Sequence, residues 1–168
     1  MGIYKGPQLI RNGLVLAYDA TDTNSYLSGS NTWYDLKRSY NGTLTNGPTF
    51  TSSGNESYIT LDGVDDTIAI SLPLSPTFPA TSSFTFEIGT SISAYPSITA
   101  SNANGQVRKC GVILGAAYYA GAAIYYTGND TATSCSVYGY IRGNDAHRVT
   151  TSYNFALNTY YHCAIVNE

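Results

Sequence analysis

The chain has 168 residues, of which 43% are hydrophobic, 13% aromatic and only 11% charged. This length and hydrophobic content suit one globular domain with a sizeable core and exclude a disordered tail. The net charge of −3 and the pI near 5.2 offer no basic surface to neutralise phosphates, so we expect neither nucleic acid nor a membrane among the partners.

The first segment, residues 1–12, contains Gly6 and Pro7 and is expected to form an N-terminal arm that reaches a neighbouring molecule. It holds no apolar run of signal-peptide length, so we expect the chain to fold in a cytosol. The rest, residues 13–168, is rich in Tyr, Gly, Ser, Thr and Asn, a composition that favours strands and turns.

Alternation of apolar and polar residues with a period of two predicts strands along most of the chain, whereas no window shows a helical stripe. The predicted strands are GLVLAYD (13–19), SYITLD (57–62), TIAIS (67–71), SFTFEIG (83–89), KCGVILG (109–115), AAIYYTG (122–128), SCSVYGYIRG (134–143), HRVTTSY (147–153) and YYHCAIVN (160–167). Two stretches, 71–83 with three prolines and 93–106, are predicted to be exposed connections. About ten short strands in one domain predict an all-β fold, an antiparallel two-sheet sandwich or jelly roll.

Three cysteines, Cys110, Cys135 and Cys163, each fall inside a predicted strand. Their number is odd and their spacing fits no metal site, so we interpret them as small buried thiols. The longest uncharged stretch, residues 112–126, is too short for a membrane helix and is interpreted as two buried strands around a turn.

Three carboxylates, Asp62, Asp65 and Asp66, occupy five consecutive positions between two predicted strands. A turn explains them, because Asp-Gly sequences admit positive φ and Asp side chains bond the nearby backbone. The alternative is calcium, which takes about six to eight oxygen ligands, with Asp19 and Asp22 as additional ligands. We favour the turn, and no cofactor is expected unless calcium binds.

The flanking strands are expected to pair with each other as an antiparallel hairpin at a sheet edge. Their alternation predicts four core-facing side chains: Ile59, Leu61, Ile68 and Ile70. The acidic loop would then connect the two strands of this hairpin.

The block NGLVLAYDATDTNSYLSGSNTWYDLKRSYNGTLTNGPTF, followed by ITLDGVDDTIAI, resembles the opening of concanavalin A-like (LamG-type) lectin/glucanase jelly-roll domains found in tailed-phage virion proteins. SFTFEIG and TYYHCAIV resemble two later strands, so the resemblance covers residues 13–90 and 159–166. Gly89 and Tyr160 stand where the family often has Trp. Related domains continue beyond the strand that ends this chain, so the domain is expected to be incomplete or open-edged after Glu168.

Catalysis is not expected. Glucanases of this fold carry a Glu-x-Asp-x-x-Glu strand, and retaining hydrolysis needs two carboxyl groups about 5 Å apart. The glutamates of this chain, Glu56, Glu87 and Glu168, have no carboxylate partner at that spacing, and the two histidines, His147 and His162, fit no triad or zinc motif. We therefore predict a protein that is not an enzyme and has no catalytic residues.

Two functions remain. The resemblance implies a structural component of a phage virion, capsid-decorating or tail-associated, assembled in the host cytoplasm with other virion proteins. An open sheet edge would be covered by a neighbouring subunit, so a symmetric homo-oligomer such as a trimer is expected. The alternative is a carbohydrate-binding module that recognises a host-surface glycan through tyrosine rings. The candidate tyrosines are Tyr118, Tyr119, Tyr125, Tyr126, Tyr138 and Tyr140.

Overall fold

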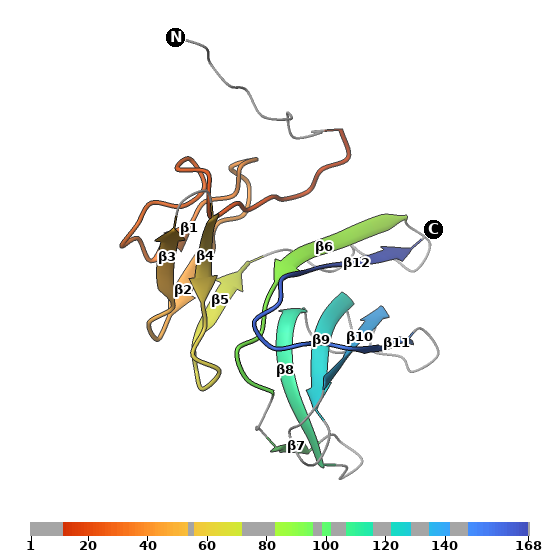
Figure 1. Cartoon of the computed structure of the whole chain (residues 1–168). Helices are drawn as coiled ribbons and strands as arrows, with labels where there is room; N and C mark the ends of the chain where they lie inside the picture. Colours follow the sequence, from red (N-terminus) through yellow and green to blue (C-terminus); the bar gives the residue numbers. More distant parts are fainter. Residues whose placement is uncertain are drawn as a thin grey trace. The chain divides into compact units, whose positions relative to one another are not determined.

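The computed structural model describes residues 12–53, 56–71, 83–95, 99–101, 107–115, 122–128, 135–141 and 148–167, and within 99–153 it describes the strand backbone. The chain forms two compact units, Met1–Leu72 and Pro73–Glu168. In the described ranges every strand pairing is antiparallel and no helix occurs (Figure 1). The predicted all-β class is therefore confirmed for these ranges.

The described residues of the first unit form five strands in two small sheets: β1 (Thr32–Trp33), β2 (Gly42–Thr45), β3 (Thr49–Ser53), β4 (Glu56–Thr60) and β5 (Thr67–Ile70). One sheet has the order β1-β2-β5, and β3 pairs with β4 as a second sheet. Figure 1 shows β3 and β4 side by side. The strands predicted at 57–62 and 67–71 are thus present as β4 and β5.

The predicted pairing of these two strands with each other is wrong. β4 pairs with β3 through Phe50 opposite Ile59, whereas β5 pairs with β2 through Leu44 opposite Ile68. Loop 62–66 therefore links two different sheets and closes no hairpin. The period-two pattern reports which residues share a face, but it carries no information about which strand becomes the neighbour.

The core-facing prediction holds for three of its four residues. Ile59, Ile68 and Ile70 are half-buried, whereas the side chain of Leu61 is 41% exposed. Leu61 lies just after the end of β4, where the chain leaves the ladder, so the alternation no longer fixes its direction.

Residues 13–19, predicted as a buried strand, form no strand in the structure. This segment is extended, but its backbone groups bond to a loop: the Leu36 N–H donates to the Ala17 carbonyl, and the Ala17 N–H donates to the Asp35 carboxylate. The apolar residues of the segment made the sequence resemble a strand, whereas a side chain in the loop satisfies its backbone.

Aromatic side chains and one leucine fill the interior of the first unit. Tyr26 and Leu44 are buried, with 4% and 7% exposure. The ring of Tyr26 lies 4.8 Å from that of Phe50 and 6.5 Å from that of Trp33, and Tyr18 lies 5.4 Å from Trp33. These tilted and edge-on contacts are the arrangements that aromatic pairs favour.

Seven strands lie in the part of the second unit that the structure describes: β6 (Phe84–Thr90), β7 (Thr99–Ser101), β8 (Val107–Gly115), β9 (Ala122–Gly128), β10 (Cys135–Ile141), β11 (Arg148–Asn154) and β12 (Tyr161–Asn167). Five of them form a sheet in the order β11-β10-β9-β8-β7, and β12 pairs with β6. All six strands predicted between residues 83 and 167 are present. β8 and β9 pair as predicted for residues 112–126, and residues 116–121 between them lie outside the described residues.

The two predicted connections have different outcomes. Residues 72–82, most of the proline-rich connection, lie outside the described residues. The stretch 93–106 contains strand β7, which pairs with β8 through Ala100 opposite Arg108. That part of the loop prediction is wrong, because Thr99–Ser101 is too short for its alternation to be recognised in the sequence.

Alternation organises the paired strands β6 and β12. Their inner face contributes Phe86, Ile88 and Ile165 to a cluster around buried Phe155, whose ring lies 4.1 Å from that of Tyr161. Cys163 also packs against this cluster, as predicted, and burial raises the pKa of its thiol. Burying these apolar side chains is worth about 1.5–3 kcal/mol for each that is fully buried.

Candidate functional site

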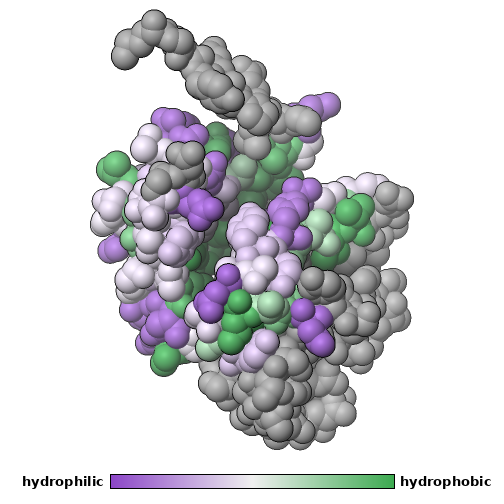
Figure 2. Space-filling view, viewed as in Figure 1, coloured by the Kyte–Doolittle hydropathy of each residue, from purple (hydrophilic) through white to green (hydrophobic). Residues whose placement is uncertain are grey.

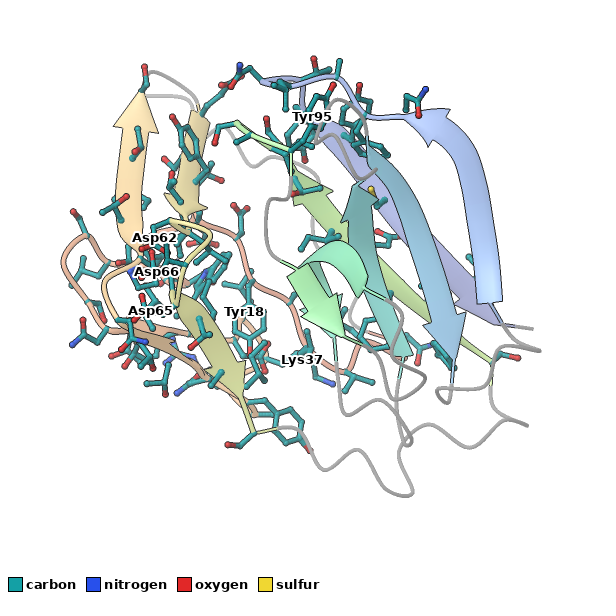
Figure 3. The ribbon with its side chains drawn as sticks, turned by 90° about the horizontal axis from the view of Figure 1, so that it is seen from below. Tyr18, Lys37, Asp62, Asp65, Asp66 and Tyr95 are labelled. Atoms are coloured by element: carbon teal, nitrogen blue, oxygen red, sulfur yellow. The ribbon has the colours of Figure 1, made fainter. Side chains whose placement is uncertain are left out.

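The acidic loop 62–66 brings three carboxylates together. One oxygen from each of Asp62, Asp65 and Asp66 lies within 4.8 Å of the others (Figure 3). The carboxylate of Asp62 accepts the N–H of Val64 at 2.8 Å and those of Asp65 and Asp66 at 3.3 and 3.4 Å. Asp66 in turn accepts the N–H of Asp62 at 2.9 Å. Hydrogen bonds within residues 62–66 therefore stabilise the loop as a turn.

The backbone of the loop agrees with this turn. Gly63 has a φ of 76°, the left-handed conformation that glycine adopts without a steric penalty. The N–H of Val64, followed by those of Asp66 and Asp65, lowers the pKa of Asp62. A side chain that stabilises its own turn explains the cluster without a metal.

Calcium remains a hypothesis for the same residues. Asp62, Asp65 and Asp66 would hold the ion, and because calcium takes about six to eight oxygens, backbone carbonyls and water would complete the site. The predicted additional ligands form turns of their own: Asp19 accepts from the backbone of Thr21 and Asp22 from that of Asn24, each at 2.8 Å. Neither belongs to the three-carboxylate cluster.

Sequence patterns do not single out Asp35, a carboxylate of the first unit whose exposure is 1%. One of its oxygens accepts the N–H groups of Ala17 at 2.8 Å and Lys37 at 3.1 Å. The other accepts those of Ser39 at 3.0 Å and Tyr40 at 3.3 Å. Burial raises the pKa of Asp35, but these four bonds together outweigh burial and leave its pKa lowered. Asp35 therefore holds segment 14–19 against loop 35–41.

Two neighbours complete this network. Ser25 is fully buried; its hydroxyl donates to the Tyr34 carbonyl at 2.7 Å and accepts the N–H of Asp19 at 3.1 Å. The Tyr18 hydroxyl donates to the Tyr40 carbonyl. Burial, and secondly the charge of Asp35, raises the pKa of Tyr18 to about 12. The side chains of Asp35, Ser25 and Tyr18 thus bond to the backbone of the first unit, an arrangement that serves structure.

The strand register sorts the candidate tyrosines in a way that sequence alone does not. Tyr125 of β9 lies opposite Tyr138 of β10, and Tyr140 is two residues further along β10. Because opposite residues share a face and the side-chain period is two, these three tyrosines share one face of the five-stranded sheet. Tyr126 is placed on the other face, opposite Val137.

The two faces carry different kinds of residue. Thr150 and Arg148 of β11 lie opposite Tyr138 and Tyr140, so polar residues share the face of the three tyrosines. The face of Tyr126 carries apolar residues: Ile124, Val137, Ile141 and Val149. Tyr118 and Tyr119 lie outside the described residues.

The remaining titratable pair lies on β6 and β12. The Nε2 atom of His162 is 3.6 Å from a carboxylate oxygen of Glu87, and their side chains are 58% and 59% exposed. His162 is therefore a strand-surface histidine, as expected. His147 and Glu168 lie outside the described residues.

The visible surface of the described residues is mainly hydrophilic, interrupted by hydrophobic residues (Figure 2). Exposed hydrophobic residues of the described ranges include Val64 and Leu27, with 79% and 62% exposure. Among the described residues, none belongs to a helix with the length and apolar character needed to cross a membrane.

A scan against protein-family models found no match, and searches of curated proteins and of solved structures found none either.

Proposed function

We propose that this protein is a non-enzymatic structural component of a phage virion, either a capsid-decorating or a tail-associated protein. It is assembled in the host cytoplasm with other virion proteins. The observation that carries the proposal is the block Gly13–Phe50, which resembles virion jelly-roll domains and whose buried polar groups, Asp35 and Ser25, bond to the backbone of the same block. Because these groups are buried and bonded to the backbone, they are not offered to a substrate.

The placement of the carboxylates also supports a role without catalysis. The described partner of the Glu87 carboxylate is the imidazole of His162 and not a second carboxylate. The aspartates of the acidic loop accept backbone N–H groups of their own turn. A retaining glycosidase needs a carboxyl pair about 5 Å apart flanking the scissile bond, so we expect no hydrolysis of β-glucans, agarose or host polysaccharide.

Mass spectrometry of purified virions, combined with antibody-labelled electron microscopy, tests the proposal. A structural component appears in the particle at a fixed copy number and at a regular position on the capsid or tail. Finding the protein only in the lysate, and never on particles, would reject a virion role. Polysaccharide hydrolysis that disappears in Glu87→Gln would reject the non-enzymatic part.

Assembly into a symmetric homo-oligomer, such as a trimer, belongs to the same proposal, because building blocks of particles repeat by closed symmetry. Size-exclusion chromatography with light scattering on the full chain measures the mass in solution. A version that lacks residues 1–12 tests whether the arm contributes. A stable monomer in both cases would contradict the assembly part.

A second function, recognition of a host-surface glycan, is favoured by one observation. Tyr125, Tyr138 and Tyr140 share a sheet face with Thr150 and Arg148. Tyrosine rings offer flat apolar surface for sugar rings, while hydroxyl and guanidinium groups hydrogen-bond to sugar hydroxyls. An array of bacterial glycans is the direct screen for such binding.

Two variants make this screen specific. Tyr138→Ala removes the central tyrosine of the proposed binding face, and Tyr126→Ala removes a tyrosine from the opposite face as the matched control. Glycan binding that is lost in the first variant and retained in the second supports the carbohydrate function. Binding that survives Tyr138→Ala assigns the glycan to another surface.

A further inference from the structure

The outward face of β6 and β12 gathers three potential metal ligands from distant parts of the chain. In the register of these strands His162 lies opposite Gly89, and Ala164 lies opposite Glu87. His162 and Glu87 are therefore diagonal neighbours on one face, and their side-chain atoms Nε2 and Oε2 are 3.6 Å apart. Both side chains are more than half exposed, so an ion in solution can reach them.

Gly89 leaves a gap on this face, and the end of the Tyr160 side chain occupies it. A Cβ atom at Gly89 would lie 2.8 Å from Cζ and 3.0 Å from Cε2 of Tyr160, and the Tyr160 hydroxyl lies closest of all. The phenol oxygen thus lies next to Gly89, the residue directly opposite His162. The His162 and Glu87 side chains and the gap at Gly89 that the phenol oxygen enters therefore lie on the same face of the strand pair.

The spacing suits a transition-metal ion. Zinc binds imidazole nitrogen and carboxylate oxygen at about 2.0–2.2 Å in tetrahedral geometry, which separates two ligand atoms by about 3.4 Å. The Nε2 to Oε2 distance of 3.6 Å is close to this separation, so binding needs only a small side-chain movement. Zinc, with its preference for nitrogen and oxygen ligands, fits this set better than calcium, which takes oxygen ligands alone.

We propose that His162 and Glu87, with the Tyr160 hydroxyl as third ligand, form a surface zinc site that clips β12 to β6. β6 is the first and β12 the last described strand in the sequence of the second unit. His162 and Glu87 are about 75 residues apart in the chain, so an ion that binds both closes a long loop. An ion that binds only the folded chain stabilises it by mass action. The inference does not depend on the virion proposal.

Isothermal titration of the full chain with zinc chloride, together with thermal unfolding at the same zinc concentrations, tests the site. We expect saturable binding at one site and a rise in the melting temperature. His162→Ala is expected to weaken binding by about tenfold or more and to abolish the rise, and Glu87→Gln to weaken it similarly, since even outer-shell partners are worth about tenfold. Tyr160→Phe is expected to weaken binding less and to leave the fold unchanged.

Two controls separate this site from other ligands of the chain. His147→Ala removes the only other histidine, and the double variant Asp65→Ala, Asp66→Ala removes two carboxylates of the acidic loop. Both are expected to bind zinc as the unmodified chain does. Equal affinity in His162→Ala, or no saturable binding by the unmodified chain, would overturn the site. Equal affinity in Tyr160→Phe would overturn the assignment of the third ligand.

Discussion

Replacing Asp35 by alanine is expected to be the most damaging single carboxylate substitution in the first unit. Its side chain is almost fully buried and accepts the N–H groups of Ala17, Lys37, Ser39 and Tyr40. These four donors come from two separate segments. Without the carboxylate, segment 14–19 loses a main connection to loop 35–41, and the donors are left in a site with little water.

The magnitude follows from the cost of leaving donors without acceptors. Each buried backbone N–H that loses its partner costs about 1–3 kcal/mol, so four would cost about 4–12 kcal/mol. Water can reach some of them, and removing the charge also removes the cost of burying it, so we expect Asp35→Ala to lower the free energy of unfolding by about 3–5 kcal/mol. The total free energy of unfolding of a domain is about 5–15 kcal/mol, so this loss is a large share of it.

Urea unfolding, monitored by tryptophan fluorescence, measures the change in the free energy of unfolding of the first unit. Trp33 is the only tryptophan, and it contacts Tyr18 and Tyr26 inside the first unit. The matched control is Asp22→Ala, which removes a carboxylate that accepts hydrogen bonds from nearby Asn24 and is expected to cost under about 1 kcal/mol. If Asp35→Ala costs no more than this control, the reasoning about the buried network is wrong.

Three further outcomes are expected. Because folding lowers the pKa of Asp35, its contribution to the free energy of unfolding is complete above its unfolded pKa and is lost as the pH falls through its folded pKa. The first unit should therefore lose stability below about pH 4, and an equally steep loss in Asp35→Asn would contradict this. In zinc-free buffer, chelator should leave the melting temperature unchanged and Asp65→Ala plus Asp66→Ala should cost little, whereas a drop of several degrees on chelation that the double variant abolishes would establish calcium. Gly89→Ala should change stability by under about 1 kcal/mol, because the exposed Tyr160 ring can move away and alanine suits a strand better than glycine; an NMR spectrum in which the Tyr160 ring is unshifted would refute the contact.

The sequence by itself predicted strands β4–β6 and β8–β12 and the all-β class of the described ranges, whereas β1–β3 and β7 were not predicted. Alternation in SFTFEIG and TIAIS depends only on which residues face the core, and a half-buried strand imposes that pattern locally. The positions of β6 and β8–β12 followed from it to within a few residues. The same pattern predicted a strand at 13–19, where the apolar residues belong instead to an extended segment bonded to a loop.

Only the tertiary structure decided which segments are neighbours. β4 pairs with β3 and not with β5, Tyr138 lies opposite Tyr125 and not Tyr126, and Asp35 accepts N–H groups from two segments. His162 meets Glu87 across a strand pair whose members are about 75 residues apart, a distance at which no spacing rule in the sequence operates. The physical reason is that alternation sets the face of each residue, whereas partners and register are set by packing between segments that are remote in the chain.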